Sequence, residues 1–535
     1  DAVSVAAVTL GESGNDFGTV TVGNAGAVTL VDSNALILGA HSATSLNATS
    51  SGNITQSGAL ALGATTLAAG TGDITLTTGT NDFTGAVTIS SGNNVAITDA
   101  NAVDFGASTI SGTLDVIATG AVSDSGAISA GATTVTNAGN TVILDAANDF
   151  DSMNVTGSTV TINDSDELDL AGVTATGAVT ITTSGALTQS GAIDADTTTS
   201  LTAGAGNDIT LTNAGNDFTG AVSIGSGNNV AITDANAVDF GASTVSGTLD
   251  VIATGAVSDS GAISAGATTV TNAGNTVIFD AANDFASVNV TGSTVTVNDS
   301  NALDIAGLTA TGAVTITTAG AITQSGAIDA DSTTSLTAGG ANNITLTDAT
   351  NDFTGAVSIV SGNNVAITDA NAVDFGASTI SGTFDVIAGG AVSDSGVLAV
   401  TGITTADTDS DDDGTGDGNI VFDANNDFST FVADAGDQTV TVSDANAIVI
   451  GNTTAATFNV TSDSDNSDTT TDTITQVGSS TITVSGTTTL NTGTDAVSVA
   501  AVTLGESGND FGTVTVGNAG AVTLVDSNAL ILGAH

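Results

Sequence analysis

The tripeptide Asn-Asp-Phe recurs along this chain at nearly even intervals, and this recurrence constrains the fold more than any other feature. Successive copies are 66, 67, 68, 67, 68, 75 and 83 residues apart. The phenylalanines of the eight copies are Phe17, Phe83, Phe150, Phe218, Phe285, Phe353, Phe428 and Phe511. A catalytic motif needs one copy, whereas a fold built from stacked units repeats its structural residues. The tripeptide therefore indicates a repeat architecture.

Two longer periods are superimposed on this one. Residues 1–41 are identical to residues 495–535, and a 135-residue period begins at Asn81. We therefore expect solenoid coils in 1–80, repeat copies in 81–215 and 216–350, a partial copy in 351–400, divergent coils with Asp-rich insertions in 401–494, and the start of the next 494-residue period in 495–535. The chain opens in mid-pattern, so we expect a segment of a longer tandem array. The alternative is an artificial duplication.

Short alternating runs such as "TVTV" (19–22) and "DITLT" (73–77) fill each repeat, and Gly, Asn, Asp or Ser clusters bound them. Period-two alternation between such clusters is typical of strands and turns. A unit of about 67 residues divides into three coils of about 22, the coil size of a parallel β-solenoid. The expected fold is therefore all-β: a parallel β-solenoid, or β-helix, of roughly 20–22-residue coils that form an elongated rod. The repeated Phe is expected to lie in the core on every third coil, with Asn and Asp at a corner.

A second motif, Asp-x-Asn-Ala, follows the Phe by 14 to 16 residues in most copies. Its aspartates include Asp32, Asp99, Asp234, Asp299, Asp369 and Asp444. Asp side chains accept hydrogen bonds from nearby backbone N–H groups in turns. The motif therefore indicates a second turn in each repeat.

The amino-acid composition excludes several classes of function. The chain has no Lys, Arg, Cys, Pro, Trp or Tyr, and its net charge is −56. Without basic residues it lacks a phosphate-binding surface, so we expect no nucleic-acid partner. Without Cys it has no disulfide or thiol nucleophile. The two histidines, His41 and His535, occupy equivalent places in the duplicated segment and are expected to face solvent or a turn.

The hydrophobic residues, 40% of the chain, argue against disorder despite the charge. No apolar run approaches the roughly 18–20 residues of a membrane helix, so we expect no membrane insertion. Nothing in the sequence supports a catalytic site, and we do not expect an enzyme or an organic cofactor. Thr-rich strands such as "TTVT" (133–136) leave open an ice-binding face, which would need Thr in register from coil to coil.

The segment "DTDSDDDGTGDG" (407–418) is the best candidate for a ligand site. Asp409, Asp411 and Asp413, followed by Gly414, match half of a D-x-D-x-D-G calcium loop, and Asp417 falls at the ninth position. The twelfth position is Ile420 in place of Glu, so this is not a complete EF-hand. The alternatives are calcium binding and a solvated acidic loop. A second Asp cluster, "TSDSDNSDTTTD" (461–472), has less suitable spacing.

The phrases "GAITQSGAIDA" (320–330), "NDFTGAVSI" (216–224) and "TDANAVDFGASTISG" (98–112) resemble the repeats of giant exported bacterial proteins, the filamentous-haemagglutinin-like, β-strand-repeat class. This resemblance implies a secreted or surface-attached fibre for adhesion, biofilm or matrix building, and hence an extracellular or cell-surface location. The complete absence of Lys and Arg departs from the usual repeats of that class.

Two functions fit these observations best. The first is a structural repeat region of an extracellular fibre, such as a surface filament, sheath or biofilm matrix, stabilised by stacked coils and divalent cations. The alternative is the stalk of a large secreted adhesin that presents a binding domain outside this segment. In either case the expected partners are further copies of the chain, end to end or side by side, and cell-surface or matrix polysaccharide.

Overall fold

The computed structural model describes residues 5–411, 413–465, 472–493 and 500–534. These residues form 55 β-strands and no helix, so they hold no helical segment that could cross a membrane. The chain divides into two compact units, residues 1–266 and 267–535. His535, part of the predicted second Asp cluster and the beginning of the predicted next period lie outside the described residues.

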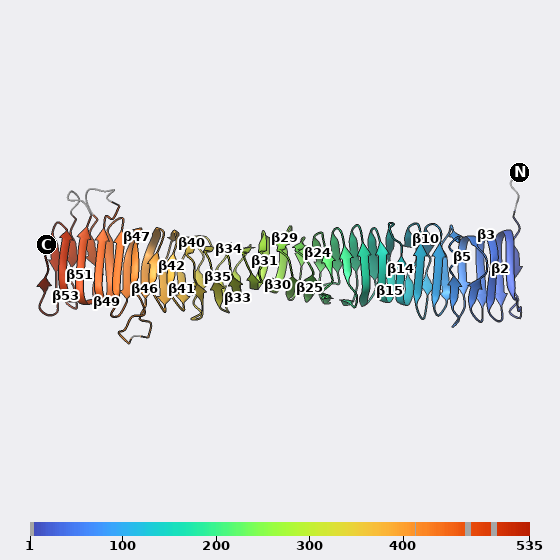
Figure 1. The fold of residues 1–535 in the computed structure, drawn as a ribbon, viewed down its shortest axis with the longest axis horizontal. Helices are drawn as coiled ribbons and strands as arrows, with labels where there is room; N and C mark the ends of the chain where they lie inside the picture. The colour runs from blue at the N-terminus through green and yellow to red at the C-terminus, as the bar shows by residue number, and fades with distance from the viewer. Residues whose placement is uncertain (1–4, 412, 466–471, 494–499, 535) are drawn as a thin grey trace. The chain divides into compact units, whose positions relative to one another are not determined.

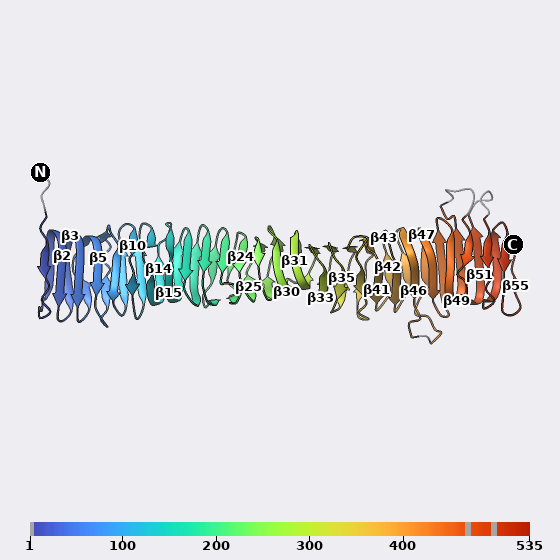
Figure 2. The same ribbon diagram turned by 180° about the vertical axis from the view of Figure 1, so that it is seen from behind.

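Each unit is a stack of parallel coils, as four consecutive strands of the first unit illustrate. β9 (Val95–Asp99), β10 (Val103–Phe105) and β11 (Ser108–Thr109) complete one coil, because β12 (Leu114–Ala118) then pairs in parallel with β9. Val95 lies opposite Leu114, 19 residues later. Strands of successive coils lie side by side within each unit in the two opposite views of Figure 1 and Figure 2. The all-β, parallel β-solenoid expected from the sequence is confirmed, with coils of about 20 residues.

The alternation seen in the sequence places apolar side chains inside the coil. In β9, Val95 and Ile97 are buried, and the residues between the inward positions are half-buried. Ile74, Val95 and Leu114 stand one above another in successive coils, each with no more than 2% of its surface exposed. Columns of this kind bury apolar area in every coil against its two neighbours.

The Asn-Asp-Phe phenylalanines do not stand on one column, and the prediction that they recur there every third coil is wrong. β15 (Val142–Gly157) contains both Phe150 and Gly157, seven residues apart. The column beneath Phe218 runs through Ala195, Ala175 and Gly157. Phe218 therefore lies above Gly157 and not above Phe150. The second unit repeats the arrangement, since Phe353 stands in the column of Gly292 while Phe285 lies elsewhere on the same strand.

The reason is arithmetic. Register partners in adjacent coils are mostly 18 to 22 residues apart, as for Val8 with Val28, Val28 with Leu46 and Thr65 with Val87. A repeat of 67 or 68 residues thus spans about three and one-third coils of about 20 residues, and each Phe starts on the next side of the coil.

The duplicated segments 1–41 and 495–535 have the same sequence in different surroundings. In the first copy β3 (Leu36–Ser50) covers β2 (Thr19–Asp32), and Val28 is 1% exposed. Its duplicate Val522 is 42% exposed. The opposite holds for the Phe, since Phe17 is half-buried and Phe511 is buried. Burial in this fold therefore depends on the coils above and below and not on the local sequence alone.

Candidate functional site

The Asn is buried in seven of the eight Asn-Asp-Phe motifs, and at Asn216 it is the centre of a buried amide network. Asn216 has no exposed surface. Its Oδ1 accepts hydrogen bonds from the backbone N–H of Ile193 at 3.0 Å and from Gln189 Nε2 at 2.8 Å, and its Nδ2 donates to Gln189 Oε1 at 2.9 Å. The same Nδ2 also donates to the carbonyls of Leu211 and Thr233. All polar atoms of this buried side chain thus have partners, as burial requires.

The partner of this Asn is a residue that the sequence analysis missed. It precedes the recurrent "SGA" turn and is Gln in "TQSGA" but Asp in "SDSGA". Where it is Asp, as at Asp124, the carboxylate accepts from Asn148 Nδ2 at 2.7 Å. The alternation of Gln and Asp at this turn was visible in the sequence, but its distance to the Asn varies from 24 residues for Asp124 and Asn148 to 33 residues for Gln476 and Asn509.

The aspartate of the Asp-x-Asn-Ala motif binds the same corner from the next coil. Asp234 is 1% exposed, its Oδ2 accepts from the backbone N–H of Phe218 at 2.8 Å, and its Oδ1 accepts from that of Asn236 at 2.6 Å. The equivalent bond occurs in seven copies at 2.7–2.9 Å. Burial raises the pKa of Asp234 above its usual value, although these two backbone hydrogen bonds oppose the shift.

Seven of the eight repeated phenylalanines are buried, and Phe17 is the exception. The buried ones are Phe83, Phe150, Phe218, Phe285, Phe353, Phe428 and Phe511. Their rings fill the interior of the coil next to the Asn and Asp just described. The motif is thus a structural corner, and its own Asp is exposed in copies such as Asp149 and Asp284.

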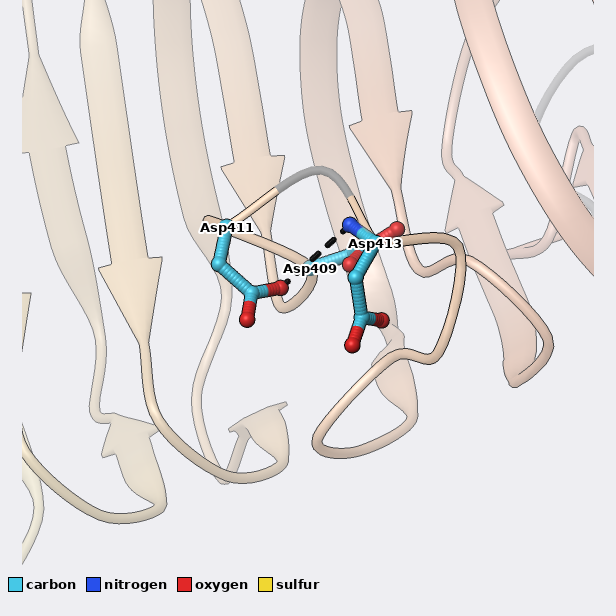
Figure 3. A group of neighbouring side chains, drawn as sticks. All are labelled: Asp409, Asp411 and Asp413. Atoms are coloured by element: carbon cyan, nitrogen blue, oxygen red, sulfur yellow. Dashed lines mark hydrogen bonds between the residues drawn. The ribbon is translucent and has the colours of Figure 1, made fainter.

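The Asp-rich loop joins β46 (Leu398–Asp407) to β47 (Ile420–Asp434). One carboxylate oxygen each from Asp409, Asp411 and Asp413 lies within 4.8 Å of the others. Figure 3 shows these three side chains on the loop. Asp409 is 3% exposed, whereas Asp411 and Asp413 are exposed. The structure therefore brings together three of the four aspartates considered from the sequence.

Asp417 is not part of this group. Its backbone N–H donates to the carbonyl of Thr408 at 2.6 Å and helps to close the base of the loop. The second Asp cluster (461–472) lies partly outside the described residues.

Two other features named from the sequence differ from expectation. His41 is buried in β3, with Nδ1 3.0 Å from the carbonyl oxygen of Gly39, and burial lowers its pKa. In "TTVT" (133–136), Thr134 stands in register between Asp115 and Asn154. The Thr column that an ice-binding face would need is thus interrupted at this strand.

Comparison with known families gives one match that covers most of the chain. A family model described as repeats of unknown function, DUF5649, matches seven times, at residues 25–90, 92–156, 157–225, 227–291, 292–360, 362–435 and 437–518. The chain belongs to the DUF5649 repeat family. No curated protein and no solved structure is detectably similar to it.

The boundaries of the DUF5649 repeats place the buried corner at the junction between one repeat and the next. Each repeat ends shortly after an Asn-Asp-Phe and begins shortly before an Asp-x-Asn-Ala or its equivalent. Phe218 belongs to the third repeat and Asp234 to the fourth, so their hydrogen bond joins two consecutive repeats. Every junction between matched repeats contains such a bond. The DUF5649 repeats of this chain are therefore linked through buried carboxylates in addition to their stacked strands.

Proposed function

We propose that this chain is a structural repeat region of an extracellular protein fibre, such as a surface filament, a sheath or a biofilm matrix. The observation that carries the proposal is the junction between repeats. Each junction uses the same buried Asp–Phe hydrogen bond and continues the parallel ladder from one repeat into the next. A structure of this kind lengthens by adding repeats without changing its core, which is what a fibre requires.

The charge of the chain supports an assembly that depends on cations. With 56 acidic side chains and no Lys or Arg, neighbouring copies repel one another within a Debye length of about 10 Å at 0.1 M salt. Like charges also face each other within a copy, since Asp194 lies in register with Asp217, and Asp329 with Asp352, on adjacent coils. Divalent cations relieve both repulsions. They provide the contact between copies that lie side by side.

Immunogold electron microscopy of the native cells, with calcium and then with a chelator, tests the proposal. We expect label on long extracellular filaments that form bundles with calcium and separate on chelation. Label at isolated, unbundled stalks that chelation leaves unchanged would favour the adhesin stalk instead. Label confined to the cell interior would contradict both.

A further inference from the structure

The Asp-rich loop is an insertion into a turn that is otherwise short. In two earlier repeats the equivalent connections are residues 137–141 and 272–276, both "NAGNT", whereas here the connection is 408–419. Thr408 takes the place of Asn137. Its Oγ1 donates to the carbonyl of Gly418 at 2.7 Å, as Asn137 Nδ2 donates to that of Thr141 at 2.9 Å. The base of the turn is therefore retained, and the acidic residues form an added loop above it.

Among the described residues of this loop, one buried carboxylate oxygen has no hydrogen-bond partner. Asp409 Oδ2 accepts from the backbone N–H of Gly414 at 3.1 Å, but Asp409 Oδ1 is buried and accepts no hydrogen bond. The oxygens of Asp411 and Asp413 accept from the backbone N–H groups of Asp413 and Thr415, at 3.4 and 2.7 Å. A buried carboxylate oxygen without a partner is costly. No Lys or Arg exists in the chain to neutralise it.

We propose that Asp409, Asp411 and Asp413 bind one Ca²⁺ ion, with Asp409 Oδ1 as the buried ligand. Calcium prefers oxygen ligands at about 2.3–2.6 Å, so one ion reaches oxygens on its opposite sides that are about 4.6–5.2 Å apart. The three carboxylates, all within 4.8 Å of one another, fit this range. Three anionic ligands on a loop that leaves two of them exposed suit calcium, which keeps water as further ligands.

The ion would also hold the loop against the next coil. The turn 435–438 follows β47, and Gly436 in it has φ +50°. A Cβ at Gly436 would lie 2.6 Å from the backbone N of Gly416 and 2.9 Å from Asp409 Oδ2. Asp409 thus lies directly against that turn. Fixing its carboxylate fixes the contact between the loop and the following coil.

The nearby charges agree with this assignment. Burial is the main cause that raises the pKa of Asp409, and Asp413 and Asp411 raise it further, while the bond from Gly414 opposes the shift. A cation reverses this balance, because it stabilises the ionised carboxylates.

Isothermal titration calorimetry of the whole chain with CaCl₂, at about 0.15 M salt to screen diffuse binding to the acidic surface, tests the site. We expect one saturable site with a Kd of about 10⁻⁴–10⁻³ M, the range of extracellular calcium modules. The double variant Asp411→Asn/Asp413→Asn, which changes only exposed side chains, should bind at least tenfold more weakly. Asp409→Asn tests the buried ligand, and the exposed Asp250→Asn serves as the matched control that leaves binding unchanged.

Hydrogen exchange provides the second measurement. Calcium should slow amide exchange in residues 413–418 and 435–438 of the wild type but not of the double variant. Absence of saturable binding, or equal binding by the wild type and the double variant, would overturn the proposal. The inference rests on the proposed fibre function for its biological role. Its own failure would appear in calorimetry, whereas failure of the fibre proposal would appear in microscopy with calorimetry unchanged.

Discussion

Acidification from pH 8 to pH 5 should stabilise this protein, and Asp444 shows why. Asp444 ends β48 (Thr439–Asp444) and has no exposed surface. Burial raises its pKa to about 7, although the backbone N–H groups of Phe428 and Asn446 donate to its two oxygens at 2.7 and 2.8 Å. Nearby Asp427 and Asp472 raise the pKa further.

The sign and size of the effect follow from linkage. A carboxyl whose pKa is higher in the folded state than in the unfolded state binds its proton more tightly when folded. Its contribution to stability is fully present below pH 3.8 and is lost as the pH rises through about 7. The whole shift of about three units corresponds to roughly 4 kcal/mol, at 1.36 kcal/mol per unit, and about 2–3 kcal/mol of it is gained between pH 8 and pH 5. Burial also raises the pKa of Asp164, to about 6, and the pKa of Asp99, Asp299 and Asp369 shifts in the same direction.

Urea unfolding followed by circular dichroism at pH 5 and pH 8 measures this effect. The midpoint should be higher at pH 5. Asp444→Asn carries no charge at either pH and should reduce the difference between the two midpoints, whereas the exposed Asp437→Asn should leave it unchanged. A midpoint that falls on acidification, or an Asp444→Asn variant with the wild-type pH dependence, would refute the reasoning.

Two further predictions concern the corner and the close approach of coils. Asn216→Ala leaves the backbone N–H of Ile193, in the coil below, without its acceptor. This variant should lower the free energy of unfolding by about 2–4 kcal/mol. The control Asn236→Ala, at an exposed residue, should change it by less than about 0.5 kcal/mol. Denaturant unfolding of both variants compares them, and equal losses would contradict the role of the buried amide. Gly191→Ala places a Cβ 1.9 Å from the Ala171 carbonyl oxygen and should cost about 1–3 kcal/mol, while Gly206→Ala, with nothing within 4 Å, should be nearly neutral. A thermal melt of Gly191→Ala that matches the wild type would show that adjacent coils can separate at this position.

The fold was accessible from the sequence because its signals are local and repeated. Alternation in runs such as "VAITD" (95–99) gives the inward and outward residues directly, and the structure has Val95 and Ile97 inside. The repeat length predicted stacked coils for the same reason. The loop at 408–418 was visible as a break in a regular pattern, and three of its aspartates do lie together.

The features that the sequence did not predict depend on contacts between coils. A period of 67 residues does not reveal how many residues one coil contains, so the column of Phe218 could not be deduced from it. The Gln189–Asn216 pair joins residues 27 apart in the chain, and only the coil length shows that they meet. Val28 and Val522 have identical neighbours in sequence and opposite exposure, which no local pattern can predict.

The fractional number of coils in each repeat has a consequence for the surface. A repeat of 67 or 68 residues is not a whole number of coils of about 20 residues, so successive motifs begin on different sides of the coil. Within each unit, the Asp that precedes each repeated Phe, half-buried as at Asp217 or exposed as at Asp149, therefore lies on different sides of the coil and does not form one charged edge. The repeat length is not a multiple of the coil length, and this mismatch places equivalent residues of successive repeats on different sides of the coil. A cation, a polymer or a second copy meets comparable chemistry from whichever direction it approaches.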